Sequence, residues 1–232
     1  MITLRPASAR GHGHTSWLDT RYSFSFADYY DPRFMGFSVL RVINEDHISP
    51  SRGFPAHGHR DMEIITYILE GSLRHQDNMG NGSVINPGDV QRMSAGTGVQ
   101  HSEFNPSTTE PTHLLQIWIL PDRKGIPPSY EQKSFANESV REPLLVVASP
   151  DGRDGSVSIN QDACIYVGKL TKEASVHHTL APGRKAWVQV ARGQIMLGDQ
   201  RLQSGDGAAL ENETQITISG DPAAELLLFD LP

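Results

Sequence analysis

Cysteine is almost missing from this sequence, which holds a single one, Cys164, among 232 residues. One cysteine excludes an intramolecular disulfide framework, so the fold must rest on a packed core, and a chain of this length can bury one. Cys164 lies in the apolar segment ACIYVG, where a small buried side chain is the simplest expectation. Nothing nearby activates its thiol, and we expect no nucleophile there.

Long apolar runs and clusters of basic residues are missing too. The longest apolar stretches, such as LLQIWIL at 114–120, are too short to span a bilayer and fit a buried strand. The formal net charge is −7, without any Lys/Arg cluster, which argues against a nucleic-acid surface. The opening segment, MITLRPASARGH, has no apolar stretch typical of a secretion signal. We expect a cytoplasmic protein with no membrane role and no direct nucleic-acid contact.

Most of the chain alternates short segments rich in Val, Ile, Leu and Tyr with turns of Gly, Asn, Asp and Pro. This pattern is typical of an all-β protein, and closely spaced strands favour a sandwich or barrel. The segment NMGNGS at 78–83 holds residues that tolerate positive φ, so it predicts a tight hairpin.

The sequence also looks internally duplicated. Residues 63–93 run through apolar strand, glycine, apolar strand, turn and Gly-Asp turn, and residues 186–210 repeat that order. Prolines and charges between the copies predict a linker with room for one short helix. We expect an N-terminal domain at 1–125, a linker at 126–142 and a C-terminal domain at 143–232.

Two pairs of residues with the same spacing predict a metal site. His57 and His59 lie two apart in HGH, and such residues share one face of a strand, about 6 to 7 Å apart. His101 and Glu103 repeat this spacing in HSE, with a carboxylate in place of the second imidazole. Three nitrogens and a carboxylate suit Fe(II), Mn, Ni, Cu or Zn, and leave two positions of an octahedral ion open for chemistry.

The remaining histidines are expected to be structural. His12 and His14 also form H-x-H, but they lie among glycines with no matching second half, so we expect surface side chains. His75 and His113 fall in predicted strands, where packing or hydrogen bonding is the simpler expectation.

The second copy has no ligands at the corresponding places. With Gly193 aligned on Gly71, the positions of the first copy's HGH and following glutamate are held by Thr179, Ala181 and Lys185. We therefore expect one metal ion per chain, in the N-terminal domain only.

The two motifs, GFPAHGHRDMEIITYILEG and GVQHSEFN, resemble those of the cupin superfamily of small jelly-roll β-barrels. The longer segments RGHGHTSWLDTRYSFSFADYYDPRFMGFSVLRVINEDHISP and MSAGTGVQHSEFNPS resemble the pirin family of two-cupin proteins, and the resemblance covers essentially the whole chain. Gly96 replaces the proline of the general cupin pattern, and one extra residue separates Glu63 from Gly71. Both departures fit pirin-like proteins. The resemblance implies an all-β fold of two tandem cupin domains, the second a degenerate one.

Two glutamates are candidates for the carboxylate ligand. A general cupin would use Glu63, whereas the pirin resemblance implies His57, His59, His101 and Glu103. Parity does not decide, because residue 63 shares the face of 57 and 59 in an unbroken strand. We favour Glu103 on the resemblance.

The resemblance also implies quercetin 2,3-dioxygenase-like activity. In that reaction a flavonol's 3-hydroxyl binds the metal as its anion, and O2 cleaves the heterocycle with release of carbon monoxide. Glu103 would be both ligand and catalytic base, Fe(II) is the metal first expected, and the partners are a flavonol-like aromatic substrate and O2. The alternative is an iron-dependent, redox-responsive regulatory module that binds a protein partner without turnover.

Overall fold

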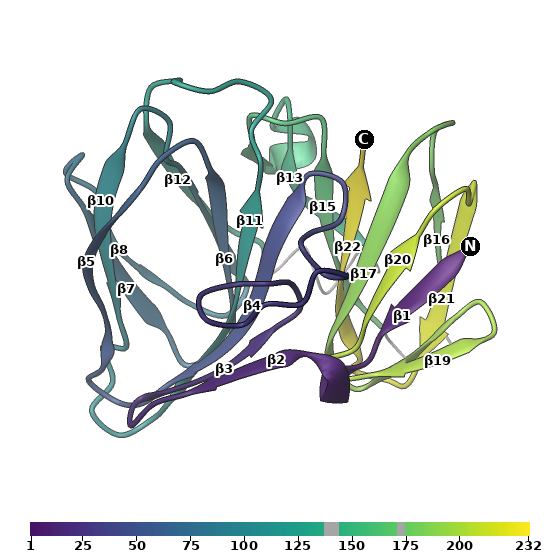
Figure 1. Cartoon of the computed structure of the whole chain (residues 1–232), viewed down its shortest axis with the longest axis horizontal. Coiled ribbons are helices and arrows are strands. Elements are labelled where there is room, and N and C mark those ends of the chain that lie inside the picture. The colour runs from purple at the N-terminus through teal and green to yellow at the C-terminus, as the bar shows by residue number, and fades with distance from the viewer. Residues whose placement is uncertain (137–143, 171–174) are drawn as a thin grey trace. The chain divides into compact units, whose positions relative to one another are not determined.

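A computed structural model describes residues 1–136, 144–170 and 175–232 of the chain, and these residues lie mainly in β-strands (Figure 1). The all-β prediction is therefore confirmed. No helix among the described residues is long and apolar enough to cross a membrane.

The chain divides into two compact units. The N-terminal unit comprises Gly11–Phe135 and Val157–Gln161, and the C-terminal unit comprises Met1–Arg10, Ala136–Ser156 and Asp162–Pro232. Each is described separately below.

The N-terminal unit is built from a large and a small antiparallel sheet. The large sheet has the order β12-β9-β6-β11-β4-β3-β2, and the small sheet has the order β5-β10-β7-β8. The large sheet's strands are β2 (Gly11–His14), β3 (Leu18–Tyr22), β4 (Leu40–Ile48), β6 (Glu63–Glu70), β9 (Asp89–Ser94), β11 (Thr112–Ile119) and β12 (Ser129–Ser134). Those of the small sheet are β5 (Gly53–His59), β7 (Leu73–Asp77), β8 (Gly82–Ile85) and β10 (Val99–Phe104), and β14 (Val157–Ser158) also belongs to this unit.

The C-terminal unit repeats the two-sheet plan. One sheet contains the run β1-β20-β17-β22-β15-β13, and the other has the order β16-β21-β18-β19. The bounds are β1 (Ile2–Arg5), β13 (Leu145–Ser149), β15 (Cys164–Lys169), β16 (Ser175–Thr179), β17 (Lys185–Arg192), β18 (Gln194–Leu197), β19 (Gln200–Gln203), β20 (Gly207–Leu210), β21 (Gln215–Gly220) and β22 (Glu225–Leu231), with short 3-10 turns η1 (Ala7–Ala9) and η3 (Arg153–Gly155).

The observed units differ from the expected ranges 1–125, 126–142 and 143–232 in two places. Met1–Arg10 joins the C-terminal unit, because β1 pairs antiparallel with β20. The expected linker contains β12, which pairs with β9 at the edge of the large sheet. Residues 137–142 of that linker, and with them part of the segment expected to hold a short helix, lie outside the described residues.

Local sequence signals explain the strands that surround the site. The apolar run at 114–120 forms most of β11, as expected, and it lies between β4 and β6. The predicted hairpin at 78–83 joins β7 to β8, and the Asp77 carboxylate accepts hydrogen bonds from the N–H groups of Met79 and Asn81. Gly80 within that turn has φ 95°, a conformation that favours glycine.

Gly96 shows why this chain departs from the general cupin motif. Its φ is 46°, which a proline ring cannot adopt, and a Cβ at this position would lie 2.0 Å from the carbonyl oxygen of Ile126. The turn that leads into β10 therefore requires glycine.

The interior of the C-terminal unit is filled by aliphatic side chains. Val176 on β16, Ile216 and Ile218 on β21, and Val188 on β17 belong to one buried cluster. Burying polar ligand side chains among these packed aliphatic groups would cost free energy. The interior of this unit is therefore an apolar core and not a ligand site.

Candidate metal centre

Two neighbouring strands of the small sheet bring the predicted ligands together. β10 pairs with β5 so that His101 faces His57 and Val99 faces His59. The register shifts between His101 and Glu103, where β5 approaches β10 so closely that a Cβ on Gly53 would lie 2.1 Å from the Glu103 carbonyl oxygen. The bulge keeps Phe54 and His57 on the interior side, although they are three positions apart in the sequence.

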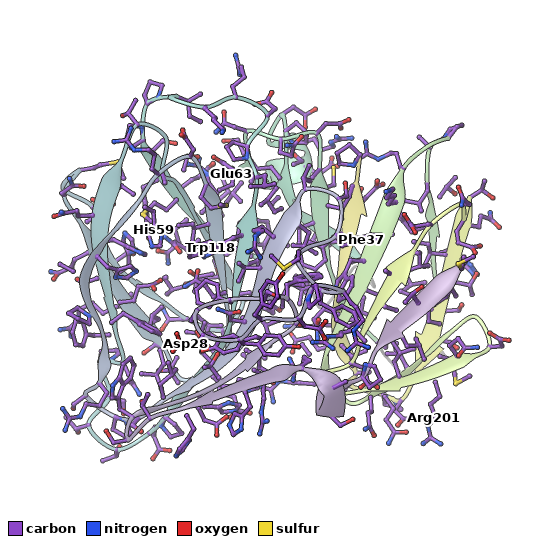
Figure 2. The ribbon with its side chains drawn as sticks, in the orientation of Figure 1. Asp28, Phe37, His59, Glu63, Trp118 and Arg201 are labelled. Atoms are coloured by element: carbon purple, nitrogen blue, oxygen red, sulfur yellow. The ribbon has the colours of Figure 1, made fainter. Side chains whose placement is uncertain are left out.

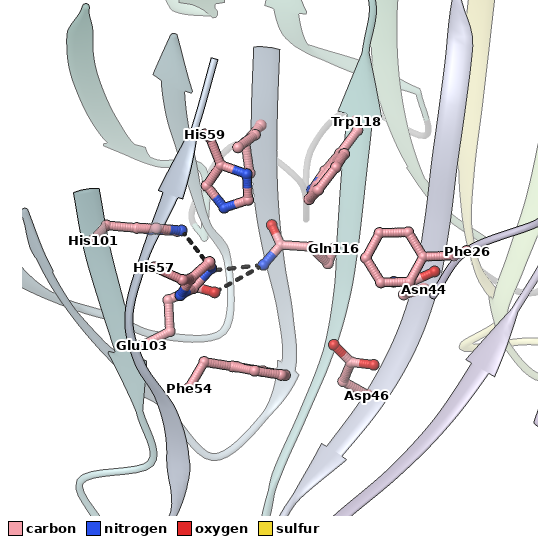
Figure 3. Close-up of a pocket in the computed structure, with 11 residues that line it drawn as sticks. Phe26, Asn44, Asp46, Phe54, His57, His59, His101, Glu103, Gln116 and Trp118 are labelled. Atoms are coloured by element: carbon pink, nitrogen blue, oxygen red, sulfur yellow. Dashed lines mark hydrogen bonds between the residues drawn. The ribbon is translucent and has the colours of Figure 1, made fainter. Parts of the chain in front are cut away.

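Three imidazoles converge at this point. Ligand nitrogens of His57, His59 and His101 all lie within 4.8 Å of one another. The Nε2 atoms of His57 and His101 are 3.1 Å apart. A dashed line marks this contact in the close-up of Figure 3. Glu103 forms an overlapping group with His101 and the neighbouring His75.

Hydrogen-bond partners assign the protons on these rings. His57 Nδ1 lies 2.8 Å from the Pro55 carbonyl oxygen, which only accepts, so a neutral His57 carries its proton on Nδ1. His75 Nε2 lies 3.3 Å from the Asp77 carboxylate, which leaves His75 Nδ1 to accept from His101 Nδ1 at 3.4 Å. His101 therefore also carries its proton on Nδ1.

Two unprotonated nitrogens thus face each other across 3.1 Å. Such lone pairs repel unless a cation lies between them. Two nitrogens each about 2.1 Å from one ion, at angles of about 90 to 110°, are separated by about 3.0 to 3.4 Å. The spacing and the tautomers of His57 and His101 fit a shared metal ion, and the Asp77–His75 chain orients one ligand as carboxylate–histidine pairs do in metalloproteins.

Burial holds His59 and His101 neutral, as metal ligands must be. Burial lowers the pKa of His101 to about 2, with the adjacent His57, His59 and His75 adding to the effect. Burial likewise lowers the pKa of His59 to about 4, helped by His57. A neutral imidazole offers a lone pair to a metal without first losing a proton.

Glu103 is buried beside these rings and has a defined orientation. Gln116 Nε2 donates to both carboxylate oxygens at 3.2 Å, and the Gln116 amide is itself oriented by a hydrogen bond from Thr66 Oγ1 to its Oε1 at 3.3 Å. Burial raises the pKa of Glu103 to about 7, although the bond from Gln116 opposes this. A carboxyl group with such a pKa can exchange a proton near neutral pH.

Glu63 lies elsewhere, because the unbroken strand on which parity left it open as a ligand is not formed. β5 ends at His59 and β6 begins at Glu63, and Asp61 between them has φ 49°, so the strand is not continuous. The Glu63 carboxylate accepts hydrogen bonds from Ser94 Oγ at 2.9 Å and from the Asn160 backbone N–H at 3.1 Å. It is absent from the groups of potential ligands among the described residues.

A pocket of about 300 Å³ opens in front of the histidines. Trp118 of β11 forms one wall, and its ring meets that of His59 edge-on, with ring centroids 5.0 Å apart. Both residues are labelled in Figure 2. The sequence analysis did not single out the other residues that line the pocket. Phe54 and Ile64 lie within the first motif, whereas the rest come from distant strands and a loop, namely Phe26, Asn44, Asp46 and Gln116.

Asp46 is a buried acid in this pocket, and its titration is testable. Burial raises the pKa of Asp46 from 3.8 to about 7. A hydrogen bond with Thr20 opposes this shift, the charges of Glu103 and Glu45 add to it, and His113 also opposes it. The folded state therefore binds a proton that the unfolded state has already lost, and stability falls as pH rises from about 4 through 7. In metal-free protein we expect wild type to lose about 2 to 3 kcal/mol of unfolding free energy relative to Asp46→Asn between pH 5 and pH 8. Urea denaturation at both pH values measures this difference, and parallel profiles would contradict it.

His113 has a structural contact, as expected, whereas His12 and His14 form a further group of potential ligands with Asp19, in which the ligand atoms lie within 4.8 Å of one another. His113 Nε2 is hydrogen-bonded to Glu45 at 2.9 Å on the outer side of β4. His12 and His14 are exposed, but both rings contact the carboxylate of Asp19, which faces His14 from the next strand. The sequence analysis did not identify Asp19, because the pairing of β2 with β3 brings it beside His12 and His14.

Comparison with known proteins covers the whole chain. The sequence profile described as Pirin matches residues 3–119, and one described as Quercetinase C-terminal cupin domain matches residues 146–231. A protein from Escherichia coli (strain K12) named Quercetin 2,3-dioxygenase is 50% identical over 232 residues, covering 100% of this chain and 99% of the relative.

Solved structures agree with this relationship. The crystal structure of YhhW from Escherichia coli has a TM-score of 0.96 at 49% identity, covering 100% of this chain and 98% of the other. The crystal structure of bacterial pirin YhhW in complex with nickel(II), from Escherichia coli, has a TM-score of 0.95 at 49% identity, covering 100% and 99%. The expected pair of cupin domains is confirmed, and the chain belongs to the pirin family.

Proposed function

We propose that this protein is a metal-dependent dioxygenase that cleaves a flavonol such as quercetin with O2. The observation that carries the proposal is the approach of His57 Nε2 and His101 Nε2 to 3.1 Å, beside a buried carboxylate in an aromatic-lined pocket. The residues that would hold the metal are His57, His59, His101 and Glu103. The name of the Escherichia coli relative, Quercetin 2,3-dioxygenase, supports the choice of reaction.

Each part of the site has a role in this reaction. When bound, a divalent transition metal lowers the pKa of a hydroxyl group that it contacts. Glu103 accepts the proton of the flavonol's 3-hydroxyl, and Gln116 keeps its carboxylate in place for that transfer. The rings of Phe54 and Trp118 pack against the flat substrate and exclude water. One flavonol and one O2 give a ring-opened ester and one carbon monoxide.

We retain Fe(II) as the first choice of metal, with Mn, Ni, Cu and Zn as alternatives, and cytoplasm as the location. The nickel(II) complex of bacterial pirin YhhW supports a divalent metal. The alternative function, an iron-dependent regulatory module that binds a protein, has less support because the 50% identical relative from Escherichia coli (strain K12) is named as an enzyme.

A direct test of the proposed reaction is optical. Protein freed of metal and then loaded with one equivalent of Fe(II) should bleach the visible absorbance of quercetin in aerobic buffer, and metal-free protein should not. The same series with Mn, Ni, Cu and Zn ranks the metals. Equal, slow bleaching with and without metal would reject the proposal.

One tightly bound metal ion per chain is the expected stoichiometry. With Gly193 aligned on Gly71, the positions that correspond to His57, His59 and Glu63 hold Thr179, Ala181 and Lys185, none of which is an imidazole or a carboxylate. The aliphatic cluster occupies its interior. Elemental analysis of loaded, desalted protein should give one ion per chain, and two retained ions would contradict the expectation.

A further inference from the structure

The pocket has a second polar region that the metal site does not use. Asn44 Oδ1, Asp46 Oδ1 and Trp118 Nε1 are buried atoms that have no hydrogen-bond partner among the described residues. Asn44 and Asp46 are 5% and 4% exposed, and all three residues line the pocket. A buried polar group without a partner costs about 1 to 3 kcal/mol, so three in one pocket call for a ligand that satisfies them.

Strand register explains why these atoms gather. Asn44 and Asp46 lie two apart on β4, so both side chains project from the same face of the large sheet. Asn44 pairs across the sheet with Gln116, the residue that holds Glu103. In Figure 3 the histidines and Glu103 lie on one side of the pocket, and Asn44 and Asp46 on the other, with Gln116 between them.

Aromatic rings lie between the two polar regions. Trp118 contacts His59 on one side and Phe26 on the other, both edge-on, with ring centroids 5.0 and 5.3 Å apart. Phe54 completes this apolar section. A flat aromatic molecule with oxygen atoms at both ends matches the sequence of polar, apolar and polar surfaces.

We propose that Asn44, Asp46 and Trp118 Nε1 form a recognition subsite for the hydroxyl groups on a ring remote from the metal-binding oxygen of the substrate. The inference rests on the proposed function, and it makes the protein selective for polyhydroxylated flavonols over unsubstituted ones.

Hydroxyl groups are the chemical class that fits these atoms. Asn44 Oδ1 accepts hydrogen bonds only, the Trp118 indole N–H donates only, and a phenolic hydroxyl can do both. Asp46 Oδ1 accepts when ionised, and a protonated carboxyl also donates, so a hydroxyl matches either form. A bare aromatic ring would leave all three groups unsatisfied, and sites of this kind reject analogues that lack the polar group.

Anaerobic binding separates this inference from the reaction itself. We would load protein with one equivalent of Fe(II) and titrate it, without O2, with quercetin and with 3-hydroxyflavone, which keeps only the metal-binding 3-hydroxyl and 4-carbonyl. Wild type should bind quercetin roughly tenfold or more tightly, the factor that one or two net hydrogen bonds supply.

Substitutions assign that preference to the subsite. Asp46→Leu and Asn44→Leu should weaken quercetin binding roughly tenfold while changing that of 3-hydroxyflavone by less than about threefold. Asp46→Asn keeps a polar group of the same shape and should retain the preference. Glu45→Gln is the matched control, because Glu45 lies on the same strand but contacts His113 on the other side. Thermal unfolding should find Asp46→Leu at least as stable as wild type at pH 8, where the buried acid is costly.

The outcomes distinguish the two proposals. Preference for quercetin that is lost in both leucine variants supports the subsite, even if no variant releases carbon monoxide. Equal binding of the two flavonols by wild type overturns the subsite, even if turnover is fast. Equal weakening of both ligands in the leucine variants also overturns it, since that result would indicate a general packing role.

Discussion

Replacing His101 by alanine is expected to abolish tight metal binding and flavonol turnover while the protein stays folded. His101 Nε2 faces His57 Nε2 at 3.1 Å, and removing one of two facing ligands should lower metal affinity more than about 100-fold, beyond the effect of losing an outer partner. His57→Ala should behave in the same way. The metal content of the desalted protein measures the loss of metal binding. The rate at which quercetin is bleached measures the loss of turnover.

The fold should survive because the imidazoles form a local polar inclusion in an otherwise packed unit. Removing one unprotonated nitrogen also relieves the repulsion between the pair in metal-free protein. His113→Ala is the matched control, since His113 lies in the same unit on β11 but contacts Glu45 instead of the cluster. Unfolding of either His57→Ala or His101→Ala would show that the metal is structural, as in domains that fold only on binding zinc.

Glu103→Gln should reduce flavonol turnover by about 100- to 10,000-fold even where residual metal remains bound. An amide oxygen can still coordinate weakly, but it accepts no proton at neutral pH. The amide would also present N–H groups toward Gln116 Nε2, which now donates to both carboxylate oxygens, so some loss of order in Gln116 is expected. Turnover per bound metal ion, measured under identical loading, isolates the loss of the base.

Glu63→Gln should have the opposite profile. Glu63 accepts hydrogen bonds from Ser94 and Asn160, so an amide there costs about 1 to 3 kcal/mol of unfolding free energy but leaves turnover per metal ion near wild type. The two variants therefore separate stability from catalysis. Full activity in Glu103→Gln together with loss in Glu63→Gln would refute the choice of Glu103 as ligand and base.

The histidine pairs were predictable from sequence because their geometry is local. Residues two apart on a strand share a face, and that rule alone brought His57 to His59 and His101 to Glu103. The same rule could not decide on Glu63, because it assumes an unbroken strand and the turn at Asp61 interrupts that strand. The rule that residues two apart share a face holds only within one uninterrupted strand.

The rest of the site depends on contacts between strands far apart in the chain. Asn44 and Gln116 meet because β4 pairs with β11, and the His75–Asp77 chain reaches His101 because β7 pairs with β10. No motif marks these residues. Register between distant strands also explains why Met1–Arg10 joins the C-terminal unit, since β1 has its pairing partner some 200 residues away.

Gas analysis of wild type is the most direct test of the central claim. Fe(II)-loaded protein, supplied with quercetin and O2, should release one carbon monoxide for each quercetin and each O2 consumed, and metal-free protein and Glu103→Gln should release almost none. Absence of carbon monoxide from every metal form of wild type, with metal bound and quercetin held in the pocket, would contradict the claim and favour a binding module without turnover.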